Sequence, residues 1–141
     1  MKLYNLSSES NNHLQERRDY IESLLASESE EHHTAAEKLT LLNLLFKKRP
    51  FNNDPTFLIE SMGVLLGDAL CQVLNLNWVM VEDGDIFSPA VAYSNSTIVS
   101  FPIDVIIKRV NQHEDIDIFY LFICIAETMS KMLKSGEYSD I

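Results

Sequence analysis

Apolar residues are spaced as in helices along most of this chain, and as in β-strands along one central stretch. That stretch, residues 78–101, contains short runs of β-branched and aromatic side chains separated by turn residues. Before and after it, apolar residues recur every three or four positions, the period of an amphipathic helix. Because the strands form one group instead of alternating with helices, the sequence predicts an α+β fold.

Five helices are expected, at residues of about 12–26, 35–48, 55–73, 102–110 and 117–134. Two capping boxes compete for the start of the second helix: Ser27 with Glu30, and Thr34 with Glu37. A proline suits the first turn of both the third and the fourth helix.

The last helix begins at a cap, either Asp115 or Asp117, and is apolar on almost all sides. A helix that is hydrophobic all round is typical of a buried core element. We therefore expect this helix in the centre of the fold. Its Cys124, like Cys71 of the third helix, is expected to be a reduced thiol packed in the core.

Three strands are expected, at residues 78–81, 90–93 and 97–101, with a turn at residues 82–85 and a short connection at 94–96. They predict a three-stranded antiparallel meander, which needs helices packed on it to be stable. The predicted order is α-α-α-β-β-β-α-α in a single domain. This domain, residues 1–141, divides into an N-terminal helical pair (1–50), a core (55–134) and a tail (135–141) that should fray.

The chain is strongly acidic, with 11 lysines and arginines against 21 aspartates and glutamates, a net charge of −10. Such a surface repels nucleic acid and anionic membranes, because both are bound by basic residues. It attracts a basic protein surface and raises the rate of association with it. The alternative is that the acidity only keeps the protein soluble.

The N-terminal residues Met1–Asn5 are followed at once by polar and acidic positions, unlike a signal peptide. The longest apolar run, residues 118–126, is about half of the ~20 residues that a membrane span needs. We therefore expect a cytoplasmic protein without membrane association.

Candidate catalytic and metal-binding groups are few. His32 and His33 are adjacent and point in different directions on a helix, and Glu28 with His32 supplies only two ligands. The two cysteines have aliphatic neighbours, which makes a thiol inert. No phosphate-binding glycine loop or nucleophile elbow occurs. We expect no enzyme activity, no metal, no cofactor and no small-molecule substrate.

Two glycines, Gly63 and Gly67, lie four residues apart inside the third expected helix, where each costs about 1 kcal/mol relative to alanine. We interpret them as points of close approach by another backbone. The neighbouring Asp68 should find a backbone donor or a cation as its partner, because an unpaired buried carboxylate is costly. The candidate cations are Lys108 and Arg109. The residues assigned a structural role are Gly63, Gly67, Asp68, Trp78 and Pro102.

Acidic residues form two clusters at the ends of expected elements. The first cluster is Glu82, Asp83 and Asp85, and the second is Glu114, Asp115 and Asp117. Such clusters most often cap helices and keep loops hydrated, but they can also bind a basic partner, hold Mg²⁺ or transfer protons. Since interface centres are usually aromatic or aliphatic, Phe87 or Tyr93 is a candidate anchor beside the first cluster.

Five short motifs stand in order along the second half of the chain: Leu65–Leu70 (LLGDAL), Trp78–Asp83, Ser88–Ala90, Phe101-Pro102 and Ile107–Val110 before an acidic turn. This G-D-A-L…W…F-P…K-R core, within residues 61–133, resembles a bacterial family catalogued only as a domain of unknown function. The resemblance implies a bacterial cytoplasmic protein. Some members resemble immunity proteins, small acidic proteins that neutralise a polymorphic toxin encoded by a neighbouring gene.

Charge and resemblance together favour an immunity or antitoxin protein, which binds a toxin acting on nucleic acid or NAD through the toxin's basic cleft. The predicted binding residues are Glu82, Asp83, Asp85, Phe87, Glu114, Asp115 and Asp117. The main alternative is a cytoplasmic secretion chaperone for an effector protein, since chaperones of this kind are also small and acidic. They usually form homodimers and have more than three strands.

Overall fold

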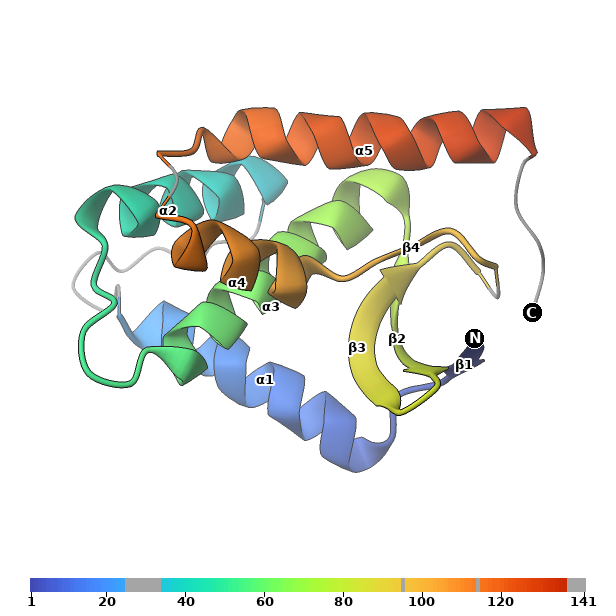
Figure 1. Ribbon diagram of the computed structural model, residues 1–141, viewed down its shortest axis with the longest axis horizontal. Helices are drawn as coiled ribbons and strands as arrows, with labels where there is room; N and C mark the ends of the chain where they lie inside the picture. The colour runs from blue at the N-terminus through green and yellow to red at the C-terminus, as the bar shows by residue number, and fades with distance from the viewer. Residues whose placement is uncertain (25–33, 95, 114, 137–141) are drawn as a thin grey trace.

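The computed structural model describes residues 1–24, 34–94, 96–113 and 115–136. Its elements, in chain order, are β1 (Lys2–Tyr4), α1 (Ser8–Ser23), α2 (Ala35–Lys48), α3 (Thr56–Leu74), β2 (Asn77–Asp83), β3 (Ile86–Ala92), β4 (Val99–Ser100), α4 (Pro102–Asn111) and α5 (Ile118–Ser135). The strands form one antiparallel sheet in the order β1-β2-β3-β4, beside five helices (Figure 1). The α+β class is therefore confirmed. The sheet has four strands, however, and the expected meander had only three.

The unexpected strand is β1, whose three residues are too few to show a period of two. It pairs with β2 so that Lys2 lies opposite Glu82 and Tyr4 opposite Met80. Its partner strand is more than seventy residues away along the chain, so no local signal reveals the pairing. β1 closes one edge of the sheet and carries the N-terminus beside the hairpin of β2 and β3 (Figure 1).

The β2–β3 hairpin turns within two residues, Gly84 and Asp85, because Asp83 and Ile86 are a paired position of the ladder. Gly84 has a φ of +63°, and glycine at the first turn position is the pattern of a type II′ turn. The expected turn at residues 82–85 was therefore too wide. Glu82 and Asp83 belong to β2 and have fixed directions on the sheet.

The central helix is α3, contacted by the other four helices and by the sheet. Length and composition alone would allow α3 to cross a membrane, but 61% of its most apolar window is buried inside the protein. The prediction that the last helix is central was wrong: α5 lies across the outside (Figure 1) and buries only Ile118, Phe122 and Met129. Its all-round apolar character comes from exposed side chains on its outer face.

The helix starts follow from local capping. Thr34 and Glu37 form the complete capping box of α2, whereas Ser27 and Glu30 lie outside the described residues. Asp117, the second of the two candidates, caps α5 by accepting a hydrogen bond from the backbone N–H of Phe119 (3.0 Å). Each cap satisfies a donor that the first turn leaves without an intrahelical partner.

The cysteines differ from the expectation in one case. Cys71 is half-buried, and burial raises the pKa of its thiol to about 12. Cys124 is exposed on α5 instead of packed in the core, because the helix that carries it is peripheral. Both cysteines are free.

Candidate functional site

The tip of the β2–β3 hairpin, residues 82–87, carries an exposed apolar pair surrounded by carboxylates. Ile86 is 63% exposed and Phe87 58% exposed, although both are large apolar side chains. Glu82, Asp83 and Asp85 lie within the same six residues, on the strand end and in the turn. The structure thus places the first predicted acidic cluster and its predicted anchor Phe87 around one two-residue turn. Glu82 and Phe87, a paired position, lie on one face of the hairpin, and Asp83 and Ile86, the next pair, lie on the other.

Tyr4 of β1 stands beside the hairpin tip. Its ring meets that of Phe87 edge to face, with centroids 6.1 Å apart, and Tyr4 is itself 42% exposed. Strand alternation places Tyr4 on one sheet face with Lys2, Met80, Glu82, Phe87 and Pro89, with the cation Lys2 directly opposite Glu82. We call this surface the hairpin face.

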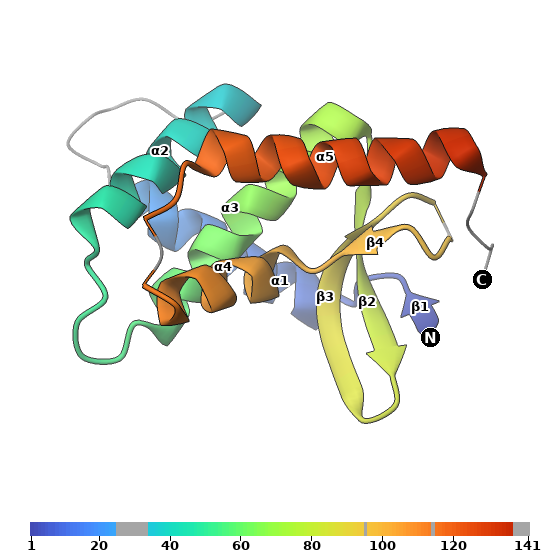
Figure 2. The same cartoon turned by 45° about the horizontal axis from the view of Figure 1, so that its top comes forward.

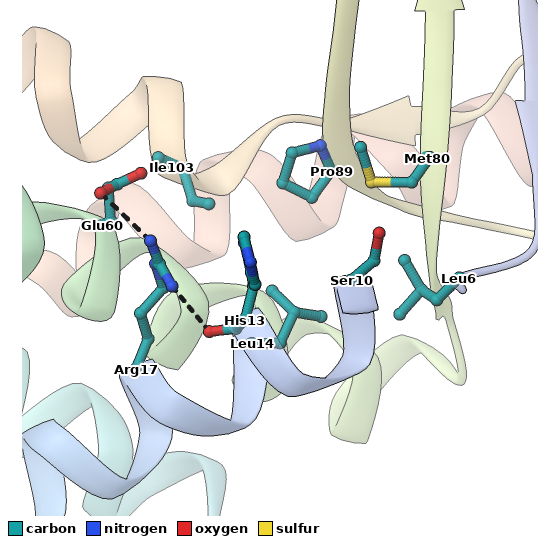
Figure 3. Close-up of a pocket in the computed structure, with 9 residues that line it drawn as sticks. All are labelled: Leu6, Ser10, His13, Leu14, Arg17, Glu60, Met80, Pro89 and Ile103. Atoms are coloured by element: carbon teal, nitrogen blue, oxygen red, sulfur yellow. Dashed lines mark hydrogen bonds and ion pairs between the residues drawn. The ribbon is translucent and has the colours of Figure 1, made fainter. Parts of the chain in front are cut away.

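A cavity of about 140 Å³ opens further along the hairpin face, where α1, α3 and α4 approach the sheet (Figure 3). Met80 and Pro89, a paired position of β2 and β3, form its sheet wall. The complete lining is Leu6, Ser10, His13, Leu14, Arg17, Glu60, Met80, Pro89 and Ile103. Five of the nine lining residues are apolar and four are polar or charged, so the cavity combines apolar walls with hydrogen-bonding groups.

Arg17 is the most constrained polar group of the cavity. Its Nη1 donates a hydrogen bond to the backbone carbonyl of His13 (2.8 Å), and its Nη2 lies 3.5 Å from Glu60 Oε1 (Figure 3). Its guanidinium carbon also lies 4.8 Å from the centroid of the Phe57 ring. These contacts hold the side chain in one position and neutralise its charge, so Arg17 shapes the wall of the cavity.

Ser10 and His13 also line the cavity, on one face of α1, but they do not form a nucleophile and base. The Ser10 hydroxyl accepts a hydrogen bond from the Ser7 hydroxyl (3.1 Å) instead of meeting the His13 ring. An activated serine needs a base within hydrogen-bond reach and a third group that orients the base. The arrangement is suited to hold an apolar or hydroxyl-bearing group.

Asp68 lies at a joint between α1, α3 and β2. Its Oδ2 accepts a hydrogen bond from Arg18 Nε (2.7 Å), and its Oδ1 accepts from Arg18 Nη2 (2.9 Å) and Trp78 Nε1 (2.9 Å). The hydrogen bond to Asp68 raises the pKa of Arg18. The expectation that Lys108 or Arg109 supplies the cation was wrong, because α4 carries those residues elsewhere and α1 packs against this side of α3.

The two helix glycines of α3 lie against the same joint. A Cβ at Gly67 would collide with the Trp78 ring and come within 2.9 Å of Pro102 Cγ. A Cβ at Gly63 would collide with the backbone of Ile103, at the start of α4. The expected close approach of another backbone is therefore confirmed at Gly63, but it was wrong for Gly67, which side chains approach. These positions place the five residues of the structural set around one contact region that joins α3 to β2 and α4.

Lys38 on α2 was not noticed in the sequence, yet it is almost fully buried. Its Nζ donates a hydrogen bond to Gln72 Oε1 (3.2 Å), and desolvation lowers its pKa. Cys71, which precedes Gln72 on α3, has a thiol whose pKa is raised chiefly by desolvation. The thiol is therefore protonated and unreactive near neutral pH. This region supports the packing of α2 on α3.

The second acidic cluster lies far from the first. Asp115 and Asp117 come just before α5, whose first turn lies at the opposite end of the molecule from the hairpin tip in both views (Figures 1 and 2). Asp117 is used as the α5 cap, Asp115 is exposed, and Glu114 lies outside the described residues. The structure therefore does not combine the two clusters into one surface.

Within the described ranges, no group of three or more His, Cys, Asp or Glu side chains is arranged to hold a metal ion. Glu28, His32 and His33, which were considered as weak ligands, lie outside the described residues.

Sequence reasoning missed Tyr4 and the cavity walls that α1 supplies. The positions of Ser10, Leu14 and Arg17, at i, i+4 and i+7, show that these side chains share one helix face. That spacing could have shown that these three side chains form one surface of α1, but not that this surface faces the sheet. The position of Tyr4 follows only from long-range strand pairing.

The family model described as "Domain of unknown function (DUF3806)" matches residues 38–122. No curated protein and no solved structure matches the chain. The matched range contains α3, the hairpin tip, Asp68 and Trp78. It does not contain β1 or α1, which supply Tyr4 and about half of the cavity lining.

Proposed function

The chain belongs to the DUF3806 family, whose function is unknown, and we propose that it is a binding protein of the immunity or antitoxin type. In this proposal it neutralises a bacterial toxin in the cytoplasm by direct contact, without chemistry of its own. The observation that carries the proposal is the hairpin tip, where exposed aromatic and aliphatic side chains stand among carboxylates around a two-residue turn.

The composition of the hairpin tip is that of an interface centre and its rim. Residues that contribute most to protein–protein affinity are aromatic or otherwise large, and they cluster at the centre of the contact. Phe87 and Tyr4 supply such side chains on the hairpin face, and Ile86 supplies one on the opposite face of the hairpin. The acidic neighbours form a polar rim that can pair with lysines or arginines of the partner.

The shape of the hairpin suits a concave partner. The β2–β3 hairpin projects away from the helices, with its turn as the most remote point of that part of the fold (Figure 2). A toxin that acts on nucleic acid or NAD needs a basic cleft for its substrate. A narrow acidic projection on a chain of net charge −10 could enter and block such a cleft, and would be steered to it.

The cavity on the hairpin face would add specificity. A partner seated over the Tyr4–Phe87 pair would reach Met80 and Pro89 next along the sheet, because these residues share one face. The cavity, at about 140 Å³, has room for one medium-sized side chain of the partner.

The proposal is tested by growth rescue in cells that express the product of a gene adjacent to the one that encodes this chain. Wild-type protein should restore growth, and a variant with Glu82, Asp83 and Asp85 changed to lysine should not. A matched variant with Glu9, Glu16 and Asp19 of α1 changed to lysine has the same net charge and should still rescue. Equal rescue by both variants would show that the acidic residues of the hairpin tip are not needed to neutralise the toxin. A neighbouring product that is secreted and not toxic would favour the secretion-chaperone alternative.

A further inference from the structure

The outer face of α5 is apolar along its first half and polar along its second. Tyr120 is 69% exposed and Ile123 50% exposed, and Phe119 and Cys124 are exposed beside them. On the same face, the second half of the helix carries the exposed residues Glu127, Thr128, Lys131 and Lys134. No described element of the chain covers this face (Figure 1).

Grooves run along both sides of the exposed ridge of α5. One lies between α5 and the end of α3, where Val73 is 53% exposed and Ile123 forms the α5 side. The other lies between α5 and the segment that precedes it, with Tyr120 and Cys124 on the α5 side. A ridge flanked by two grooves is the surface that a second helix packs against, ridge into groove.

Charge decides which partner fits this face. α5 contains one glutamate and two lysines, a net charge of +1, in a chain of net charge −10. With Asp115 and Asp117 included, the segment 115–135 has three acidic and two basic residues, a net charge of −1. Two copies of this segment therefore meet with little net repulsion, although the chain as a whole is strongly acidic.

The charges are also complementary between the two ends of the helix. Asp115 and Asp117 stand at its start, and Lys131 and Lys134 lie near its end. If two copies of α5 pack antiparallel, each acidic start lies beside the other copy's basic end. Parallel packing would place like charges together.

We propose that two copies of this chain form a twofold dimer through antiparallel packing of α5, with the axis near Ile123 and Cys124. In this arrangement the apolar halves cover one another, and Lys131 of one copy faces the 115–117 segment of the other. The interface is isologous, so each substitution acts twice. The hairpin tips lie on the other side of the molecule (Figure 1) and remain free to bind.

Light scattering after size-exclusion chromatography tests the dimer directly. Wild-type protein should have a mass twice the 16.1 kDa of one chain at high concentration and shift toward one chain on dilution. Ile123→Glu and Tyr120→Glu should be monomeric with an unchanged far-ultraviolet circular dichroism spectrum, because both side chains are exposed. Phe87→Glu, an equally exposed residue of the hairpin tip, should remain dimeric. A wild-type monomer at every concentration, or dimers of both α5 variants, would overturn the proposal.

Charge exchange tests the antiparallel direction. Lys131→Glu and Asp115→Lys should each weaken the dimer by about tenfold, roughly 1.4 kcal/mol in free energy, and the double variant should recover most of the loss. Cys124 should also link the two copies through a short bismaleimide, and Cys124→Ser should abolish the link. No recovery in the double variant together with no Cys124 cross-link would contradict the antiparallel arrangement.

Discussion

Tyr4 and Phe87 meet edge to face, with ring centroids 6.1 Å apart, at the point where the N-terminal strand reaches the hairpin tip. The contact joins β1, which the family match does not include, to the hairpin, which it does. A binding surface at the tip therefore depends on both parts of the chain. The short β1 strand supports the aromatic side chain that we place at the centre of the interface.

A double-mutant cycle should detect the Tyr4–Phe87 contact. Tyr4→Ala and Phe87→Ala together should cost less stability than the sum of the single changes, by about 0.5–1.5 kcal/mol, the coupling expected for an aromatic pair. The measurement is urea-induced unfolding followed by circular dichroism. The control cycle combines Tyr4→Ala with Phe119→Ala on α5, which should be additive. Additive effects in the first cycle would mean that the rings do not interact in solution.

Asp68→Asn should lower the free energy of unfolding by about 1.5–3 kcal/mol, the range for hydrogen bonds to charged groups. The asparagine keeps one oxygen for Trp78 but presents an NH₂ group to the donors of Arg18. The half-buried guanidinium then loses its counter-charge. Glu16→Gln on the exposed side of α1 is the matched control and should change stability little. A denaturation midpoint of Asp68→Asn equal to that of wild type would show that the joint contributes nothing.

Gly67→Ala should destabilise the protein by about 1–3 kcal/mol, the usual cost of overpacking. The added methyl group meets the Trp78 ring and Pro102, neither of which can move without disturbing α4 or β2. Helix propensity alone predicts the opposite, a gain of up to about 1 kcal/mol. Val73→Ala, on the exposed part of α3, controls for the general effect of alanine in this helix. A higher melting temperature for Gly67→Ala would refute the close packing.

The two thiols should differ in reactivity toward iodoacetamide at pH 8 and low protein concentration. Burial raises the pKa of Cys71 to about 12, so its reactive thiolate is almost absent at that pH. Cys124 is exposed and should be labelled first. Mass spectrometry should find one label per native chain and two after addition of urea. Equal labelling rates of the two cysteines in the native protein would contradict the burial of Cys71.

The helices could be predicted because their signals are local. The Thr34–Glu37 capping box and the Asp117 cap lie within one turn of the helices they start. The class of fold followed from the single group of strands. β1 could not be predicted, since three residues have no measurable period and the partner strand is distant in the sequence.

The relative burial of the two most apolar helices was not evident from their composition. α3 and α5 are both rich in apolar residues, and the more continuous run in α5 suggested that α5 is central. The distinguishing feature is the pair Gly63 and Gly67, which lets Ile103 and Trp78 approach α3 closely. α5 has no glycine inside it, packs on the protein through one face, and exposes apolar side chains on its other face.

The candidate site was predictable in the part that is contiguous in sequence. Glu82, Asp85 and Phe87 had to lie close together because one hairpin carries them. The cavity and the partner of Asp68 both depend on α1, and Arg18 is fifty positions away from Asp68. The cost of burying an unpaired carboxylate predicted a hydrogen-bond or cation partner for Asp68, but it did not specify which element supplies the partner.

Quantitative capture from a lysate of the native host tests most directly that the hairpin tip binds a basic partner. Three immobilised proteins are compared by mass spectrometry: wild type, the tip variant with Glu82, Asp83 and Asp85 changed to lysine, and the α1 variant with Glu9, Glu16 and Asp19 changed to lysine. Wild type and the α1 variant should enrich the same protein, with a basic domain, and the tip variant should lose at least about tenfold of that signal. Equal enrichment by the tip variant, or equal loss in both variants, would contradict binding through the hairpin tip.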